Sequence, residues 1–431
     1  MKNMTTLAER AHLMPSDTAG PGLFPAGLER LAQRALRGRL QRLEHGRITI
    51  VDAGRRDTYG RATPRCDLHA TLHVDSRRFY AEAAFGGSVG AGESFMAGDW
   101  TTPDLASLVR ILLVNRDVLE GLDSGWSRLA EPARRLLHLA ARNTPEGSRR
   151  NIAAHYDIGN DFFECFLDPT MTYSCAVFER DGMSLEEAQV AKLERLCRKL
   201  DLKPGDHLLE IGTGWGALAI HAARNYGCRV TTTTISREQH ALARQRIDAA
   251  RLANRITLRL DDYRDLDGHY DKLVSVEMIE AVGHQYYDTF FRRCGDLLAP
   301  GGTMVLQSIT IDDRQYGAAR DSVDFIKRHI FPGCCIPSVT ALVESATRAS
   351  RLRLVDLEDI GPHYATTLAA WRRNLLANAE KIRARGYPEG LLRMWHFYLA
   401  YCEGGFAERA LGDVHMVLQD TAIPARPTPR V

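Results

Sequence analysis

The sequence lacks paired cysteines, long apolar runs and a strong excess of either charge. Its nine cysteines are scattered, and the adjacent Cys334 and Cys335 have no second pair or histidine cluster to complete a metal site. We therefore expect no metal, and free thiols in a reducing cytoplasm. The absence of a secretory signal or a transmembrane run fits that compartment. A net charge of +2 is not the basic excess of a typical DNA-binding protein, so nucleic acid is not an expected partner.

What is present is the profile of a globular protein. Hydrophobic residues make up 45% of the 431 residues and charged residues 26%, enough for two or more cores. A basic amphipathic helix is predicted over residues 26 to 47. An ordinary surface helix packed on its own domain is the simpler interpretation, and contact with an anionic membrane surface is the alternative. The apolar face holds Leu28, Leu31, Ala32, Ala35, Leu36, Leu40 and Leu43, and Arg30, Arg34, Arg37 and Arg42 fall largely off it.

The first third of the chain is predicted to form a small domain with several strands. Alternating patterns from Ile48 to about Ala83 indicate short strands, the last over "RRFYAEAAF". A glycine-rich connection then leads into a helix near 105 to 119, and "RNTPEGSRRN" is typical of a linker. We therefore predict an N-terminal domain over 1–145 that contacts lipid, a second domain over 146–422 and a disordered tail over 423–431.

The second domain alternates strands with helices. This order predicts an α/β fold with a doubly wound, Rossmann-like sheet. A long helical insert is expected from Tyr364 to Arg409, before a final strand at "VHMVLQD". The earlier strands are expected at "HLLEIG", "CRVTTTTIS", "ITLRLDDY", "YDKLVSVEM", "GGTMVLQSITI" and "RLRLVDLEDI".

A glycine-rich loop follows the first strand of this domain. Glu210 precedes Gly212, Gly214 and Gly216 in "LLEIGTGWGA", and a helix follows. Glycines at such a loop let the backbone approach a nucleotide closely. NAD is the second choice, because a dinucleotide site needs an acidic residue at the strand tip about 20 residues on, and in "TTTTISREQ" the strand tip carries hydroxyls and no acid. The polar groups at the next two strand ends, including Asp262, favour S-adenosylmethionine.

Eight blocks of sequence together resemble the cyclopropane-fatty-acyl-phospholipid synthase family, whose members use S-adenosylmethionine and are related to the mycolic acid cyclopropane synthases. The resemblance runs from about Asn151 to Gln419 and implies a class I methyltransferase fold. The blocks are "NIAAHYDIGNDFF", "LDPTMTYSCAVFE", "LLEIGTGWG", "TTISREQ", "EMIEAVGHQYYDTFF", "IFPGCCIPS", "GPHYATTLAAW" and "YLAYCEGGF".

The resemblance implies transfer of a sulfonium methyl group to a cis double bond of an acyl chain. The resulting cation needs a base to remove a proton before the ring closes, and the family holds a bicarbonate ion for this purpose. Carried over by position, the bicarbonate site comprises Cys175, Glu280, Gln307, Ile309 and Tyr364, with Cys402 as a further candidate catalytic residue. The cofactor-binding residues carried over are Tyr173, Ser174, Gly212, Gly214, Thr234, Gln239, Asp262 and Tyr263.

Several of these residues have ordinary structural alternatives. Gln307 stands where the family blocks have histidine, and glutamine donates and accepts hydrogen bonds but does not titrate near neutrality. Thr213 replaces a cysteine of the family's glycine loop. Cys175 and Cys402 are equally consistent with buried thiols that only pack. The aromatic residues of the helical insert either line an acyl tunnel or pack a core; they are Trp371, Trp395, Phe397 and Tyr398.

The resemblance therefore predicts an enzyme that forms cyclopropane rings in unsaturated phospholipid acyl chains. The expected location is the cytoplasm, in peripheral contact with the inner face of the membrane, and a homodimer is an option. The alternatives are a methyltransferase that leaves methylene- or methyl-branched chains, one that acts on a small molecule other than a lipid, and a non-catalytic binding protein.

The glycine loop gives a first testable prediction. Gly212→Val adds a branched side chain to the loop where the methionine end of the cofactor is expected, so binding of S-adenosylmethionine should be lost while the fold survives. Calorimetric titration measures the binding and circular dichroism the fold. Unchanged affinity would remove this loop from the site.

Overall fold

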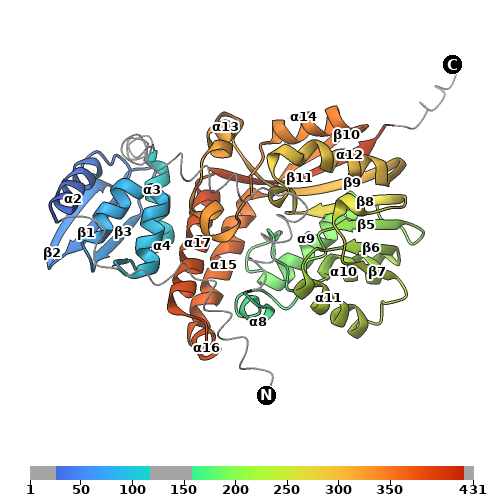
Figure 1. The fold of residues 1–431 in the computed structure, drawn as a ribbon, viewed down its shortest axis with the longest axis horizontal. Coiled ribbons are helices and arrows are strands. Elements are labelled where there is room, and N and C mark those ends of the chain that lie inside the picture. The colour runs from blue at the N-terminus through green and yellow to red at the C-terminus, as the bar shows by residue number, and fades with distance from the viewer. Residues whose placement is uncertain (1–25, 117–157, 422–431) are drawn as a thin grey trace. The chain divides into compact units, whose positions relative to one another are not determined.

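The computed structural model describes residues 26–116 and 158–421 (Figure 1). The chain forms two compact units that do not follow its linear order. The first takes in 1–140, 322–332 and 368–410, and the second takes in 141–321, 333–367 and 411–431. Much of the predicted helical insert thus clusters with the N-terminal region. The predicted boundary after residue 145, the linker and the tail lie outside the described residues and stay predictions.

The first unit contains a four-stranded sheet with the order β2-β1-β3-β4. β1 pairs antiparallel with β2 and parallel with β3, and β3 pairs antiparallel with β4. Across the described residues no helix combines the length and apolarity needed to cross a bilayer. The elements are α2 (Ala26–Leu40), β1 (Gly46–Asp52), β2 (Arg55–Arg61), β3 (His69–Val74), α3 (Arg78–Ala97), β4 (Trp100–Thr101), α4 (Leu105–Val114), the π-helix Ile326–Ile330, the end of α15 (Gly361–Ala377), α16 (Ala379–Ala384) and α17 (Glu389–Ala407).

The prediction of a strand over "RRFYAEAAF" followed by a glycine-rich connection is wrong, because this segment forms helix α3. The helix tolerates its glycines because they allow close packing. A Cβ on Gly92 would lie 2.4 Å from the ring of Phe325, and one on Gly90 would lie 2.1 Å from the carbonyl oxygen of Glu82. Gly87 bends the helix with a φ of 58°. Propensity alone misled here because Gly92 serves a contact with Phe325, which is distant in sequence, and Gly90 serves the kinked packing of the helix on itself.

Helix α2 packs on the sheet through Ala32, Leu36 and Leu40, while Leu31 is 61% exposed. Arg37 does not point to solvent as predicted. Its guanidinium forms ion pairs of 3.3 Å with Asp52 and 2.6 Å with Asp57. The simpler interpretation of this helix, packing on its own domain, accounts for these contacts.

The second unit contains a seven-stranded sheet with the order β10-β11-β9-β8-β5-β6-β7. Strands β5 to β9 are parallel to their neighbours, and β11 runs antiparallel between β9 and β10. The elements are α8 (Asn160–Phe163), α9 (Leu185–Lys199), β5 (His207–Ile211), α10 (Ala217–Tyr226), β6 (Arg229–Thr233), α11 (Arg237–Ala249), β7 (Ile256–Arg259), β8 (Tyr270–Val276), α12 (Tyr287–Leu297), β9 (Leu298–Ile311), α13 (Asp313–Asp321), α14 (Val339–Ala349), β10 (Leu352–Asp359), the start of α15, β11 (Leu411–Asp420), and the 3-10 turns Tyr263–Asp265, Ile279–Ala281 and His284–Tyr286.

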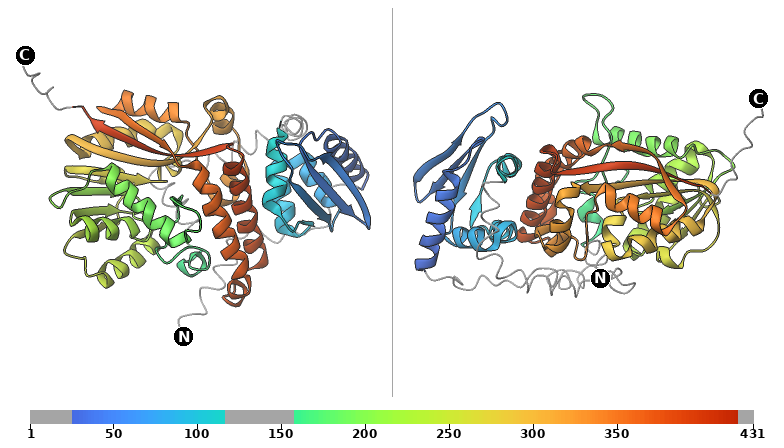
Figure 2. Two further views of the ribbon diagram at one scale, coloured as in Figure 1. Left: turned by 180° about the vertical axis from the view of Figure 1, so that it is seen from behind. Right: turned by 90° about the horizontal axis from the view of Figure 1, so that it is seen from above.

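Helices cover both faces of this sheet, which confirms the predicted doubly wound α/β fold. α9, α10 and α11 pack on one face and α12 and α14 on the other (Figures 1 and 2). Neighbouring strand residues alternate between the two cores, so Leu208 joins the first and Leu209 the second. Because strand side chains point to opposite faces, this alternation buries both sides of the strand. The carboxyl ends of β5, β6 and β8 consequently meet at one edge, where ligands bind in such folds.

The ion pairs of Arg37 give the second prediction. Arg37→Ala removes the cation from Asp52 and leaves Asp57 with Arg55 as its partner, at 2.9 Å, so the free energy of unfolding of this unit should fall by about 1 to 3 kcal/mol. Arg34→Ala, on the exposed side of the same helix, should change it by less than about 0.5 kcal/mol. Thermal unfolding of the full chain followed by circular dichroism compares the two. Equal melting curves for both variants would mean that the ion pairs add no stability.

Candidate active site

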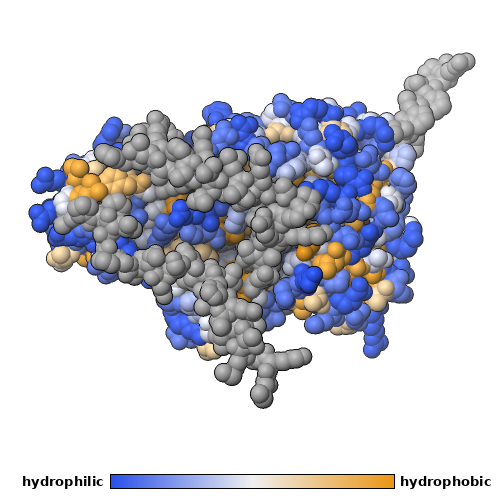
Figure 3. Space-filling view, in the orientation of Figure 1, coloured by the Kyte–Doolittle hydropathy of each residue, from blue (hydrophilic) through white to orange (hydrophobic). Residues whose placement is uncertain are grey.

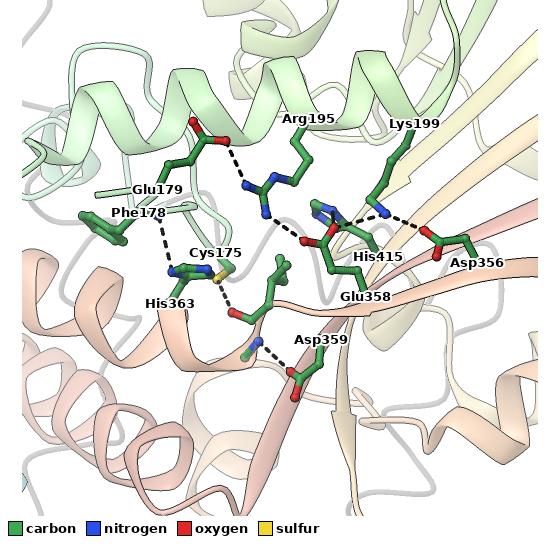
Figure 4. A network of polar contacts seen from close by, with 12 residues as sticks. Cys175, Phe178, Glu179, Arg195, Lys199, Asp356, Glu358, Asp359, His363 and His415 are labelled. Atoms are coloured by element: carbon green, nitrogen blue, oxygen red, sulfur yellow. Dashed lines mark hydrogen bonds and ion pairs between the residues drawn. The ribbon is translucent and has the colours of Figure 1, made fainter. Parts of the chain in front are cut away.

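The turn Tyr173-Ser174-Cys175 lies against the start of α15. The amide of Phe178 donates to Nδ1 of His363 at 3.4 Å, and the thiol of Cys175 lies 3.8 Å from the carbonyl oxygen of Ile360 (Figure 4). The amide of Ala176 donates to the hydroxyl of Thr367 at 3.1 Å. These contacts hold the turn in place, and the amide of Cys175 donates to Glu277, the residue that follows β8.

Ion pairs surround this turn on its outer side. Arg195 of α9 bridges Glu179 at 2.8 Å and Glu358 of β10 at 2.7 Å (Figure 4). Lys199 contacts Asp356 at 2.6 Å and Glu358 at 3.1 Å. The segment that follows the turn is thereby fastened to both α9 and the edge strand.

Glu277, the residue after β8, is the centre of the polar cluster. Its Oε1 accepts from the amide of Cys175 at 2.8 Å and from Nε2 of Gln307 at 2.8 Å. Its Oε2 accepts from the hydroxyl of Tyr364 at 2.6 Å. Three predicted site residues from three separate segments thus converge on one carboxylate.

Glu277 has a backbone φ of 46°, in the left-handed region that favours glycine. Such a conformation costs about 1 kcal/mol or more for a residue with a side chain. The amide of Glu277 donates to the carbonyl oxygen of Gln307 at 2.9 Å, which helps to hold it. The strain keeps the carboxylate turned toward its three donors.

Glu280 lies beside this carboxylate but uses different partners. Its Oε1 accepts from the amide of Ile309 at 2.6 Å and from the hydroxyl of Ser308 at 3.0 Å. Among the described residues, its Oε2 has no hydrogen-bond partner. Burial, and then the negative charge of Glu277, raise the pKa of Glu280 to about 8. Glu280 is therefore protonated at neutral pH.

The start of β11 completes the cluster. Nε2 of Gln307 also donates to Asp413 at 3.2 Å, and Nε2 of His415 lies 3.1 Å from Oε1 of Gln307. Burial, and then the charge of Glu277, raise the pKa of Asp413 well above its usual range. Burial lowers the pKa of His415 to about 3, so this imidazole is neutral and donates to the amide oxygen. Gln307 is consequently oriented with its amide nitrogen toward the carboxyl groups.

A buried cation supports the turn from α9. Nζ of Lys192 donates to the hydroxyl of Ser174 at 2.6 Å, and Nε2 of Gln189 donates to the carbonyl oxygen of the same serine at 2.9 Å. Burial lowers the pKa of Lys192. Tyr173 packs its ring on Phe163, with a centroid distance of 5.6 Å.

The glycine loop connects β5 to α10 as predicted. Gly212, Gly214 and Gly216 have φ values of 103°, 52° and 87°, all in the region that glycine adopts most readily. A Cβ on Gly212 would lie 3.5 Å from Cβ of Met278, so the loop runs beside the residue that follows Glu277. A Cβ on Gly214 would meet nothing within 4 Å, so this part of the loop borders open space.

The acid ahead of the loop is not a free ligand for a cofactor. Oε2 of Glu210 accepts from the hydroxyl of Thr232 at 2.5 Å, and that hydroxyl lies 2.6 Å from the hydroxyl of Thr213. Burial raises the pKa of Glu210 to about 8. Glu210 and Thr213 therefore hold the loop against β6.

The remaining predicted cofactor residues lie at the ends of β6 and β7. The hydroxyl of Thr234 donates to Oε1 of Gln239 at 2.8 Å. The buried carboxylate of Asp262 is engaged by Arg264, whose Nε and Nη2 each donate at 2.8 Å. Among the described residues the buried hydroxyl of Tyr263 has no partner. These four residues sit at the expected edge of the sheet, and their role toward a cofactor stays a prediction.

Cys402 lies on α17 in the first unit and is not among the partners of Glu277. Burial raises the pKa of its thiol, which opposes a role as a base at neutral pH. Trp371, Trp395, Phe397 and Tyr398 are buried in the same unit. That fits the packing alternative for these side chains, while an acyl tunnel lined by them stays a prediction.

The predicted bicarbonate does not fit the cluster as it stands. The groups that would hold this anion are the amide of Cys175, the amide nitrogen of Gln307 and the hydroxyl of Tyr364, and all three donate to Glu277. The amide of Ile309 is taken by Glu280. A second anion would have to displace the Glu277 carboxylate or lie against it.

Sequence reasoning missed Glu277, Lys192, Asp413 and His415. Glu277 directly follows a parallel strand in "SVEMIEAVGH", a position from which side chains face a ligand in this fold. This position after a strand could have identified Glu277, but only Glu280, the second glutamate of the motif, was predicted. Lys192 lies on α9, outside the sequence blocks that carry the resemblance. Asp413 and His415 lie on a strand whose place beside β9 depends on long-range pairing.

The comparisons with known proteins agree on one family. The sequence profile of the family described as mycolic acid cyclopropane synthetase matches residues 143–416. Tuberculostearic acid methyltransferase UfaA1 of Mycobacterium tuberculosis is 41% identical over 327 residues, 74% of this chain and 76% of that protein. Cyclopropane-fatty-acyl-phospholipid synthase of Escherichia coli K12 is 36% identical over 345 residues, 79% of this chain and 85% of that protein.

Solved structures show the same relationship. Mycolic acid cyclopropane synthase CmaA1, complexed with SAH and CTAB, is 33% identical with a TM-score of 0.59, covering 63% of this chain and 98% of that one. Coclaurine N-methyltransferase, at 20% identity and a TM-score of 0.58, shares the fold.

The raised pKa of Glu280 gives the third prediction. An unfolded glutamate releases its proton near pH 4.3, whereas the folded chain keeps this one up to about pH 8. Because the folded state then binds more protons, Glu280 lowers stability as pH rises between these values, by about 1.4 kcal/mol per pH unit at most.

Glu280→Gln removes this proton uptake, so the variant should gain about 1 to 2 kcal/mol relative to the parent between pH 6.5 and 8. Chemical unfolding of both proteins across that range measures the gain. Glu186→Gln, at an exposed glutamate of α9, is the matched control and should run parallel to the parent. A Glu280→Gln curve that also runs parallel to the parent would contradict the assignment of a protonated Glu280.

Proposed function

Because the chain belongs to the mycolic acid cyclopropane synthetase family, we propose that it converts cis double bonds of phospholipid acyl chains into cyclopropane rings. It is an S-adenosylmethionine-dependent methyltransferase of the lipid-modifying class, and the family predicted from the sequence is confirmed. The observation that supports ring formation in phospholipid acyl chains is the cluster of carboxyl groups beside the glycine loop. Ring formation requires both a methyl donor and a group that removes a proton, and the two sites adjoin through Met278.

The phospholipid substrate is supported by the Escherichia coli relative, whose name states a fatty-acyl-phospholipid synthase and whose match extends over 79% of this chain. The Mycobacterium tuberculosis relative is named as a tuberculostearic acid methyltransferase. It favours the alternative in which the same cation loses a different proton and leaves a branched chain. Both products begin with the same methyl transfer to an alkene.

Each part of the site has a definite task in this reaction. S-adenosylmethionine supplies an electrophilic methyl group on a sulfonium. The turn at Tyr173 and Ser174 and the loop at Gly212 are proposed to bind its methionine end, and Asp262 and Gln239 its nucleoside. Tyr364 is 5% exposed, so its ring offers an apolar, electron-rich face to a cation. A site with little water protects such a cation from hydration.

We also propose peripheral contact with a membrane through the first unit. Leu31 is the most exposed of the large apolar side chains in the described residues, and the exposed Arg30 and Arg34 flank it on α2. The visible face of the molecule is mostly hydrophilic, with apolar residues in small groups (Figure 3). Anionic lipid headgroups are therefore the expected contact. A homodimer stays a prediction, and the proposed reaction depends neither on it nor on a bound bicarbonate.

Lipid analysis of a heterologous bacterial host tests the proposed function. Expression of the chain should add one CH₂ to monounsaturated acyl chains of intact phospholipids, measured by mass spectrometry. Ozone should leave the product uncleaved if it is a ring and cleave it if it is a methylene branch. The control is Gly212→Val, which should leave the lipids unchanged. A host whose phospholipids gain no CH₂ would refute the proposal, and gain only in free fatty acids would refute the phospholipid substrate.

A further inference from the structure

The groups predicted to hold an external anion already hold one that belongs to the chain. A carboxylate and a bicarbonate share a planar set of oxygens that accept hydrogen bonds. Glu277 accepts from the amide of Cys175, the amide of Gln307 and the hydroxyl of Tyr364, at 2.8, 2.8 and 2.6 Å. Among the described residues, these three donors surround the carboxylate of Glu277 as they would surround a bound anion.

We propose that Glu277 is the general base of this enzyme and takes the place of a bound bicarbonate. The proposal rests on the proposed function, because it concerns the proton that must leave before the ring closes. It adds that Glu277 is a catalytic residue and that turnover does not require bicarbonate.

The location of Glu277 suits this role. It follows the last residue of β8 at the ligand-binding edge of the sheet, and its neighbour Met278 lies against Gly212 of the proposed cofactor loop. Glu277 is half-buried, whereas Gln307, Asp413 and Glu280 around it are buried. It is thus the member of the cluster that retains access to a reacting group.

The neighbouring groups leave Glu277 as the proton acceptor. Glu280 and Asp413 both have raised pKa values, in each case through burial and then the charge of Glu277. With a pKa of about 8, Glu280 is protonated at neutral pH, and the raised pKa of Asp413 favours its protonated form. Cys175 has a thiol pKa raised by burial and is likewise no base. His415 is neutral, and its Nε2 is already hydrogen-bonded to Gln307.

The step balances without an added co-reactant. The π electrons of the alkene form a bond to the sulfonium methyl carbon as the carbon–sulfur bond breaks, and S-adenosylhomocysteine leaves with that bond's electron pair. An oxygen of Glu277 then takes one proton from the new methyl group, and the released C–H electrons close the ring onto the cationic carbon. Glu277 returns the proton to solvent after product release.

The test compares the parent with two variants in buffer stripped of carbon dioxide. Parent turnover should be the same with and without added bicarbonate. Glu277→Gln keeps the shape of the side chain but not its basicity, so turnover should fall by about 10² or more. Glu277→Gly suits the left-handed backbone at this position and frees the three donors. Its turnover should fall similarly and recover in part on adding bicarbonate.

Three readouts decide the outcome. Calorimetric titration of bicarbonate should show binding to Glu277→Gly and none to the parent. Titration with S-adenosylmethionine and a thermal melt confirm that both variants remain folded and bind the methyl donor. Asp201→Gly is the matched control, since it removes an exposed carboxylate from another left-handed residue, with φ of 50°, and should leave turnover unchanged.

Parent turnover that needs added bicarbonate would overturn the proposal. So would a folded Glu277→Gln whose turnover stays within about threefold of the parent. These outcomes are distinct from failure of the proposed function, in which the parent yields no modified lipid at any bicarbonate concentration. In that case the calorimetric titration of bicarbonate into the parent and into Glu277→Gly still shows whether Glu277 occupies the anion site.

Discussion

The hydrogen bonds to the Glu277 carboxylate are the constraint on which the rest of the site depends. They join the turn at Cys175, the end of β8, Gln307 of β9 and Tyr364 of α15. Each of these segments reaches the cluster from a different part of the second unit. Without an acceptor at this point, the amide of Cys175 would lose the carboxylate to which it donates, and a buried donor left unsatisfied costs about 1 to 3 kcal/mol.

One ionised carboxylate also explains the electrostatics around it. Its charge, added to burial, raises the pKa of both Glu280 and Asp413. Lys192 is the buried cation nearest the turn, and burial lowers its pKa while nearby carboxylates oppose that shift. A site with one ionised acceptor among neutral acids is able to remove a proton from a cation without gathering several charges in a low-dielectric region.

The sequence predicted the second unit well because its signals are local. Each parallel strand is a short apolar run followed by a helix, and Gly212 marks the loop that is predicted to bind the cofactor. The placement of β11 between β9 and β10 is not local, so Asp413 and His415 could not be assigned to the site from their own segment. The error at α3 has a similar origin, since Gly92 is explained only by Phe325, which packs on it from a distant part of the sequence.

The predicted site residues show the same difference between what the local sequence indicates and what only the fold reveals. Cys175, Gln307 and Tyr364 were found by resemblance and do converge, but the group on which they converge was not foreseen. The motif "SVEMIEAVGH" contains two glutamates, and only the geometry after β8 distinguishes them. The left-handed backbone of Glu277 places its carboxylate among the three donors, whereas the carboxyl group of Glu280 accepts from the amide of Ile309. Backbone conformation at a single residue thus decides which carboxylate occupies the anion site.

A crystal structure of the complex with S-adenosylhomocysteine, grown with bicarbonate present, tests this arrangement most directly. The account predicts that the carboxylate of Glu277 fills the space between the amide of Cys175, Gln307 and Tyr364, with no separate anion there. A trigonal anion on those three donors, with the Glu277 side chain turned away, would contradict it.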